Sequence, residues 1–413
     1  MLNKKIAAIV AASGMAVAGL ALGITPAKAF DPVSNSYAIV GSDTLEDVVG
    51  ALANGTNVTG SGVRVTTSDS STVASFDATG SGTIITKPYG NRFQRPNGSG
   101  DGRKALEAAI KGFANGGTFT ATPNTFSTAS DLNWSSSSVD GQVDISRGSS
   151  GGTVDNTATG VLARYTFGRD AIAFAYGSGV TPGANGYISA ANMALLFTCD
   201  TATLTNFGIT NVVIPQAGSG TRKDFLSKLG ITDDSTFTAL YTSNPGGNST
   251  QSHCVKVGQE HDASGLLSTE IMPMSASRWI AMQNGVSYKK IATGVQLGSL
   301  VSGASSVSGT APNMVPGVTY YKDSTWGRDT YLFVDKRRVD STNVNYDPVL
   351  TALFDYTNET SLTYQGPSTG ANAATAYTAM STVPSFGAYT AAAVKLKFGF
   401  LPASVEDKQF AHN

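Results

Sequence analysis

The sequence is poor in cysteine, histidine and charged side chains. It has two Cys and three His in 413 residues, and Asp, Glu, Lys and Arg together make up only 14% of the chain. So few thiols and imidazoles, in no recognised spacing, argue against a metal centre, and we expect no cofactor. With a formal net charge of −1 and no basic cluster, nucleic acid is not the expected partner. Hydrophobic residues still make up 41% of the chain, which is enough for folded cores.

The first residues have the pattern of a secretory signal peptide. Lys4 and Lys5 precede an apolar, Ala-rich run over residues 6–24, and Ala27-Lys28-Ala29 is a small-x-small cleavage site. We therefore predict that residues 1–29 are removed near Ala29 and that the protein is secreted or periplasmic. The alternative is that the run stays as an uncleaved anchor. Because this segment contains no Cys, we expect no lipid anchor at the cleavage site.

Cys199 and Cys254 are the two cysteines. In an exported protein a disulfide between them is the default expectation. The alternative is a pair of buried thiols.

Short apolar runs alternate with helical patterns along the chain. The strands that we expect lie at residues 37–40, 143–145, 170–176, 211–214 and 329–334, and the helices at residues 45–52, 105–113, 189–197, 225–229 and 347–354. Asp43 and Glu46 have the spacing of a capping box, and Ser189 is placed to cap its helix. The alternation predicts parallel α/β sheets, and the length predicts two domains.

Three turns share one composition: Gly41-Ser42-Asp43-Thr44, Gly98-Ser99-Gly100-Asp101 and Gly218-Ser219-Gly220-Thr221. Each precedes a predicted helix, where free backbone N–H groups and hydroxyls can bind an anion. A single turn of this kind is usually a plain helix cap. A fourth segment, Ser146-Arg147-Gly148-Ser149, follows a predicted strand and adds a guanidinium suited to an oxyanion. Together the four segments predict an oxyanion site.

A nucleotide is not the expected anion. The GxxxxGK[ST] motif is absent, since Arg222 follows Thr221 and no Lys fills the required place. No GxGxxG opens a dinucleotide-binding unit. We therefore expect a free oxyanion.

The order of the motifs resembles the phosphate-binding proteins of phosphate ABC importers. The segments that carry the resemblance are GSDT, GSG, VDISRGSS, GRDAIAFAY, YISAANMALLF, GSGTR, RDTYLFVDKR and GFLPAS. An actinobacterial exported branch of that family is more similar still, because it has a counterpart to Gln259-Glu260-His261-Asp262 followed by an apolar helix with Trp279-Ile280-Ala281. The resemblance spans most of the chain after the signal peptide.

The resemblance implies a type II periplasmic-binding-protein fold, in which two α/β lobes close around the ligand. The first lobe would comprise residues 30–168 and 326–413, and the second residues 169–325. Two hinge crossovers would join them, near residues 164–170 and 326–329.

The resemblance also implies a set of ligand donors. Carried over by motif, they are Ser42, Thr44, Ser99, Ser149, Ser219, Gly220 and Thr221. The family's Arg before GSGT falls on Pro215 here, so Arg147 or Arg222 would supply the charge; the alternative is that both are ordinary surface or first-turn residues. The family's acid falls on Ser149, and Asp43 is the possible substitute, with a helix cap as its alternative role.

The function that we expect is capture of inorganic phosphate, or a similar oxyanion, for an ABC permease, by a monomer without catalytic residues. One alternative is a secreted surface or adhesive protein that kept the fold without tight binding. The other is a secreted serine hydrolase, because Gly148-Ser149-Ser150-Gly151-Gly152 matches GxSxG. His261 is then the one plausible catalytic base, although it is also readily explained as an ordinary hydrogen-bonded histidine.

Overall fold

The computed structural model describes residues 34–110, 118–119, 137–155, 160–242, 253–367, 380–405 and 408–412. The predicted signal peptide, the predicted end of the second helix and its Gly116-Gly117 stop lie outside the described residues. Within them, no helix combines the length and the apolar character needed to cross a membrane.

One mixed sheet of eleven strands forms the centre of the molecule. Its main path is β11-β10-β12-β9-β16-β7-β1-β2, with β8, β13 and β17 attached beside it. The strands are β1 (Tyr37–Gly41), β2 (Val73–Ser75), β7 (Ile145–Gly148), β8 (Thr153–Val154), β9 (Leu162–Tyr176), β10 (Asn211–Pro215), β11 (Val255–Gly258), β12 (Glu270–Ser275), β13 (Gln296–Gly298), β16 (Gly327–Asp335) and β17 (Lys408–His412). β1 pairs parallel with β2 and β7, and β10 pairs parallel with β11 and β12. Because β9 and β16 run antiparallel to their neighbours, the prediction of purely parallel sheets was wrong.

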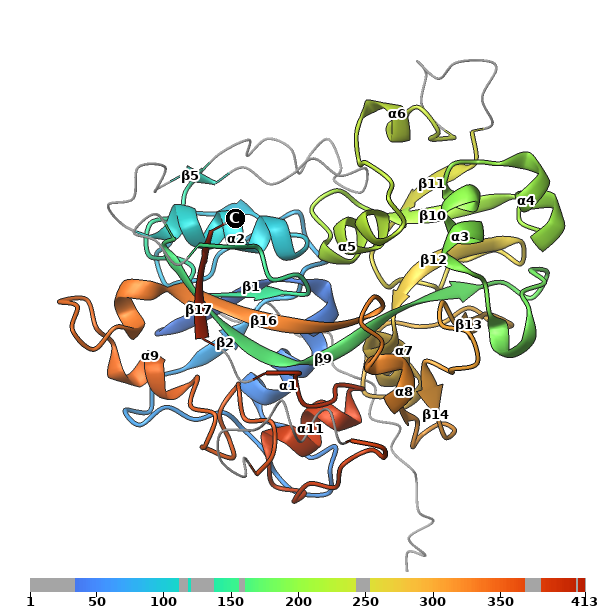
Figure 1. Cartoon of the computed structure of the whole chain (residues 1–413). Coiled ribbons are helices and arrows are strands. Elements are labelled where there is room, and N and C mark those ends of the chain that lie inside the picture. The colour runs from blue at the N-terminus through green and yellow to red at the C-terminus, as the bar shows by residue number, and fades with distance from the viewer. Residues whose placement is uncertain are drawn as a thin grey trace, which may run out of the picture.

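The longest strand, β9, belongs to both halves of this sheet. Its first part pairs with β16 and β17, and its second part pairs with β12 and β13. In Figure 1, β9 and β16 run together through the middle of the molecule, from the elements around β1 and α2 toward β12. The sequence predicted only residues 170–176 as strand, because Arg164 and Arg169 interrupt the apolar pattern. Residues 164–170 and 327–329, near which the crossovers were expected, lie within these paired strands.

The helices flank the sheet. They are α1 (Glu46–Asn54), α2 (Ser99–Ala109), α3 (Ala190–Phe197), α4 (Thr201–Phe207), α5 (Gly220–Lys228), α6 (Ser235–Thr238), α7 (Ala276–Gln283), α8 (Val318–Tyr321), α9 (Pro348–Ala352) and α11 (Ala391–Lys397). The predicted cap at Ser189 is confirmed, since its hydroxyl accepts the Asn192 N–H. The capping box predicted from Asp43 and Glu46 was wrong: a short 3-10 turn, η1 (Asp43–Leu45), precedes α1, and neither helix start has a side-chain cap.

Two other local predictions needed correction. The strand expected at residues 143–145 begins at Ile145 and runs through Gly148 as β7, so Ser146 and Arg147 lie within the strand. Residues 300–318, whose Gly, Ser and Pro content predicts a linker, contain the small hairpin of β14 (Val307–Ser308) and β15 (Val315–Pro316). The remaining short strands, β3 (Thr83–Ile84), β4 (Phe93–Gln94), β5 (Thr118–Phe119) and β6 (Ser137–Ser138), pair in two further hairpins.

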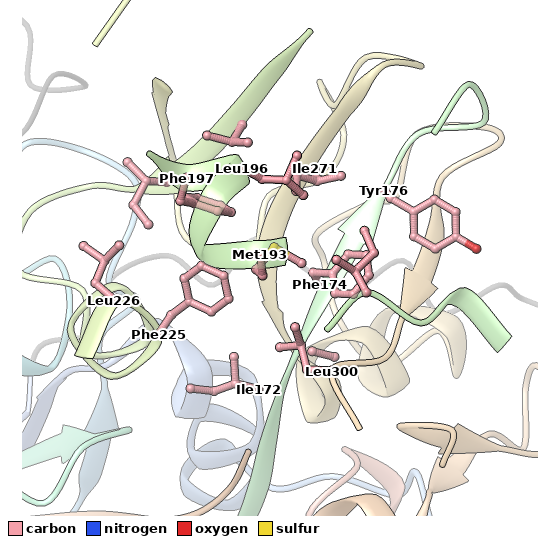
Figure 2. Close-up of a cluster of buried hydrophobic side chains, with 14 of the residues drawn as sticks. Ile172, Phe174, Tyr176, Met193, Leu196, Phe197, Phe225, Leu226, Ile271 and Leu300 are labelled. Carbon is pink, nitrogen blue, oxygen red and sulfur yellow. The ribbon is translucent and has the colours of Figure 1, made fainter. Parts of the chain in front are cut away.

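The apolar side chains gather on both halves of the sheet. One cluster lies among β9, β10, β12, α3 and α5; Figure 2 shows Phe174, Met193, Phe197, Phe225 and Ile271 within it. Two further clusters lie around β1, α1, α2 and α11. Each half of the sheet therefore has a core of its own.

The expected disulfide is confirmed. Cys199 and Cys254 are bonded across a sequence separation of 55 residues. The bond joins the turn between α3 and α4 to the start of β11, and both residues belong to the same apolar cluster.

This disulfide should contribute strongly to stability. A cross-link that closes a loop of 55 residues removes conformational entropy from the unfolded chain, worth about 4 kcal/mol in the chain-entropy description. We expect the double variant Cys199→Ala/Cys254→Ala to lose free energy of unfolding by about that amount. Urea denaturation of both proteins measures it, and an unchanged midpoint at equal slope would contradict the prediction.

Candidate functional site

Two of the predicted anion-binding turns meet directly. The Gly100 N–H, in the first turn of α2, donates to the Gly218 carbonyl ahead of α5 at 3.2 Å. A Cβ added at Gly220 would lie 2.5 Å from Ser99 Oγ and closer still to Ser149 Oγ. In Figure 1 the ends of α2 and α5 face each other above the central strands. A side chain at position 220 would therefore force the hydroxyls of Ser99 and Ser149 to move.

The hydroxyls around this contact are buried and differ in their partners. Ser99 Oγ accepts the Ser149 N–H at 3.0 Å and lies 3.0 Å from Ser149 Oγ. Ser219 caps α5 by accepting the Arg222 N–H at 3.0 Å, so its hydroxyl performs the plain capping role. Ser42 Oγ is buried and has no hydrogen-bond partner among the described residues.

His261 links the remaining turn to α5. Its Nε2 lies 3.1 Å from Thr44 Oγ1 and 3.4 Å from Thr221 Oγ1. Nδ1 accepts the Ser275 N–H at 3.2 Å, so the neutral ring carries its proton on Nε2. Burial lowers the pKa of His261, although neighbouring Glu260 opposes this. The ring is therefore a neutral donor between Thr44 and Thr221, and it joins the first predicted turn to the third.

This tautomer bears on the hydrolase alternative. A general base must offer a free nitrogen lone pair to the nucleophile, whereas the Nδ1 lone pair of His261 is taken by a backbone N–H. The hydroxyl of Ser149 is bonded to Ser99. In the described part of the chain, the serine of the GxSxG match therefore lacks the paired base that nucleophilic catalysis needs.

Arg147 is bonded to the protein itself. Its guanidinium donates to the carbonyls of Gly41, Ser42 and Phe76 and to the hydroxyl of Ser75. The side chain is completely buried, and desolvation lowers its pKa. It fixes the backbone of the first turn against the strand beside it.

Arg222 points away from the other turns. It donates to Asp233, to the hydroxyl of Tyr241 and to the Pro215 carbonyl at 2.9 Å. Its guanidinium also lies over the rings of Phe237 and Tyr241. These contacts hold α5 to α6 and to the end of β10.

The guanidinium that is bonded to the hydroxyl of Thr221 belongs to Arg328, which the sequence analysis did not single out. Arg328 Nη2 donates to Thr221 Oγ1 at 2.8 Å and to Asp170 Oδ2 at 2.9 Å. In the same ladder, Arg169 pairs with Asp329 at 3.1 Å. Gly-Arg-Asp occurs at both 168–170 and 327–329, and antiparallel pairing sets each Arg opposite the other Asp. That repeat is the signal that would have identified the residue.

A buried cluster of charges lies beside His261. Asp43, Glu46 and Asp47, around the start of α1, face Arg278 of α7 and Lys289. Burial disfavours the charge of Lys289, but Asp43 and Glu46 raise its pKa above the ordinary value. Asp43, a predicted ligand, is thus paired with a lysine. Among the described residues, no group of three or more His, Cys, Asp or Glu is placed to hold a metal ion.

Glu260 brings a further carboxylate to the start of α5. The side chain is completely buried, with Oε1 3.3 Å from His261 Nε2. Neither oxygen makes a hydrogen bond of good geometry among the described residues, although the hydroxyl of Thr221 and the charge of Arg328 both act on it. The sequence analysis named Glu260 only within Gln259-Glu260-His261-Asp262, a tetrapeptide that also fits a solvated loop, and did not predict it at the site.

The acidic surroundings of the first turn predict a pH effect on stability. Burial, reinforced by the charge of Glu46, raises the pKa of Asp77 from 3.8 to about 7. Because the folded state then binds more protons than the unfolded one below pH 7, stability from this group is present in acid and is lost as pH rises toward 7. Asp77→Asn should therefore stabilise the protein more at pH 8 than at pH 5. Urea unfolding at both pH values measures this, with the exposed Asp140→Asn as control; equal gains at the two pH values would refute it.

The comparisons with solved structures return phosphate-binding proteins at low identity. A candidate phosphate ABC transporter substrate-binding protein from Clostridium perfringens, solved with bound phosphate, is similar at 12% identity and a TM-score of 0.41, over 79% of this chain and 96% of that one. An ABC-type phosphate transport receptor from Vibrio cholerae is similar at 14% and 0.37, over 74% and 90%. A phosphate-binding protein from Stenotrophomonas maltophilia is similar at 11% and 0.39, over 73% and 79%. No protein-family model and no curated protein sequence matches the chain. The case for a function therefore rests on the residues of the site.

Proposed function

We propose that this protein is an exported, two-lobed binding protein for a free oxyanion, with inorganic phosphate as the ligand and an ABC permease as the recipient. The observation that carries the proposal is the convergence of three Gly/Ser helix starts, from residues 41–44, 98–101 and 218–221, on one buried polar centre. Helix starts that act only as caps need not lie next to one another.

The chemistry of this centre suits an oxyanion. Backbone N–H groups at the starts of α2 and α5 lack intrahelical partners, and the helix dipoles favour negative charge there. The hydroxyls of Ser42, Thr44, Ser99, Ser149 and Thr221 are buried around them. Arg328, bonded to Thr221, replaces Arg147 and Arg222 in our proposal as the nearest positive charge.

The proposed lobes are residues 30–168 with 326–413, and residues 169–325. Support comes from the separate apolar cores on the two halves of the sheet and from β9, which pairs with strands of both. Hinge motion of such lobes around a ligand is a common closing mechanism. The ligand would then contact donors from both lobes.

Isothermal titration with phosphate, sulfate and arsenate tests the proposed function. Saturable heat with phosphate and arsenate, and none with sulfate, is the expected result. Heat with sulfate alone would identify sulfate, and not phosphate, as the ligand. No heat with any of the three anions would favour the alternative of a secreted surface or adhesive protein.

The glycine at the contact between the turns provides a sharper test. A side chain at position 220 would overlap Ser99 Oγ and Ser149 Oγ, so Gly220→Val should hold the turns apart. We expect phosphate binding to weaken by about 100-fold or more, since a misplaced donor set loses several kcal/mol. Titration of the folded variant measures this. Gly50→Ala, in α1 with nothing within 4 Å of the added Cβ, is the control and should bind normally. Unchanged affinity in Gly220→Val would mean that the turn is structural.

A further inference from the structure

The start of α5 already faces an anionic group of the protein itself. The carboxylate of Glu260 is completely buried, and its closest donor is His261 Nε2, 3.3 Å from Oε1. The hydroxyl of Thr221, in the first turn of α5, and the guanidinium of Arg328 also act on it. These are the groups that surround the proposed oxyanion.

The backbone of Glu260 is held on both sides. Its N–H donates to Gln216 Oε1 at 2.8 Å, and its carbonyl accepts from Lys289 Nζ at 3.0 Å. Gln216 is in turn bonded to Asn97, immediately ahead of the turn that opens α2. The next residue, His261, has a left-handed φ of 55°, which turns the chain sharply and keeps the carboxylate and the imidazole together. The position of the carboxylate is therefore built into the fold.

The carboxylate is ionised at ordinary pH. Burial by itself would raise the pKa of Glu260, but the contact with His261 Nε2, the hydroxyl of Thr221 and the charge of Arg328 lower it below its ordinary value. A carboxylate whose oxygens lack well-formed hydrogen bonds and that lies at a helix start is a small, permanent oxyanion.

We propose that the Glu260 carboxylate is an internal oxyanion that occupies the donor set at the start of α5 and competes with the external ligand. This inference rests on the proposed function, since it assigns a competitor to the same site. An incoming phosphate must share Thr221, His261 and Arg328 with a fixed negative charge. Like charges a few ångströms apart in a buried site oppose each other strongly, so Glu260 holds the affinity for oxyanions down.

The test compares Glu260→Gln with the wild-type protein in phosphate titrations. Gln keeps the shape and the size of the side chain and removes the charge, so we expect phosphate to bind at least about tenfold tighter, a change of about 1.4 kcal/mol. Asp262→Asn is the matched control: it makes the same charge change two residues away, on a side chain that is exposed and, among the described residues, is bonded to Ser264 alone. The control should bind like the wild type. Far-UV circular dichroism and thermal unfolding establish that each variant is folded, and Glu260→Ala replaces Glu260→Gln if the latter is not.

The possible results distinguish a failure of the inference about Glu260 from a failure of the proposed function. Tighter binding in the Glu260 variant, with an unchanged Asp262→Asn, supports the inference. Binding that is equal to or weaker than wild type overturns it and leaves the proposed function standing, since Glu260 would then be neutral toward the ligand or help to bind it. No binding of phosphate, sulfate or arsenate by any of the proteins overturns both.

Discussion

The reciprocal ion pairs between β9 and β16 determine the geometry on which the rest of the molecule depends. Arg328 opposes Asp170, and Arg169 opposes Asp329, in one antiparallel ladder. Asp170 also accepts from Ser275 Oγ and the Ser277 N–H, which orients the start of α7. Buried charges are stable only when they are paired in good geometry, and removing one partner typically costs about 3–5 kcal/mol. The two longest strands can therefore adopt only one register, and α5 and α7 are positioned by it.

The positive charges near the site divide into two groups with different tasks. Arg147 and Arg222 donate to carbonyls and side chains of the protein, so their hydrogen bonds maintain the shape of the first turn and the attachment of α5. Arg328 reaches the first turn of α5, yet its charge is already balanced by Asp170. What remains for a ligand is mostly neutral: backbone N–H groups, hydroxyls and an imidazole N–H. Such donors depend on close approach, which explains the glycine at position 220.

Local features could be predicted from the sequence, while long-range ones could not. The strand at β10, the cap at Ser189 and the disulfide follow from apolar runs, a short polar side chain before a helix, and two cysteines in an exported chain. The capping box failed because Asp43 and Glu46 meet Lys289 and Arg278 from distant segments, and a buried ion pair outweighs a local cap. β9 was predicted too short because its arginines are buried by pairing, which no window of neighbouring residues reveals. For the same reason Glu260 and Arg328 were not identified as site residues, and His261 was considered only as a catalytic base.

The inferred role of Glu260 also bears on how such a molecule closes. When two helix starts are brought together, their free N–H groups lose water and need a replacement partner. If a ligand is the only such partner, closure is coupled to binding, because the ligand interacts with the closed state alone. A carboxylate built into the site supplies part of that stabilisation beforehand. If the proposed function and the inferred role of Glu260 both hold, the ligand contributes only the difference between its own interactions and those of Glu260, and binding is then only weakly coupled to closure.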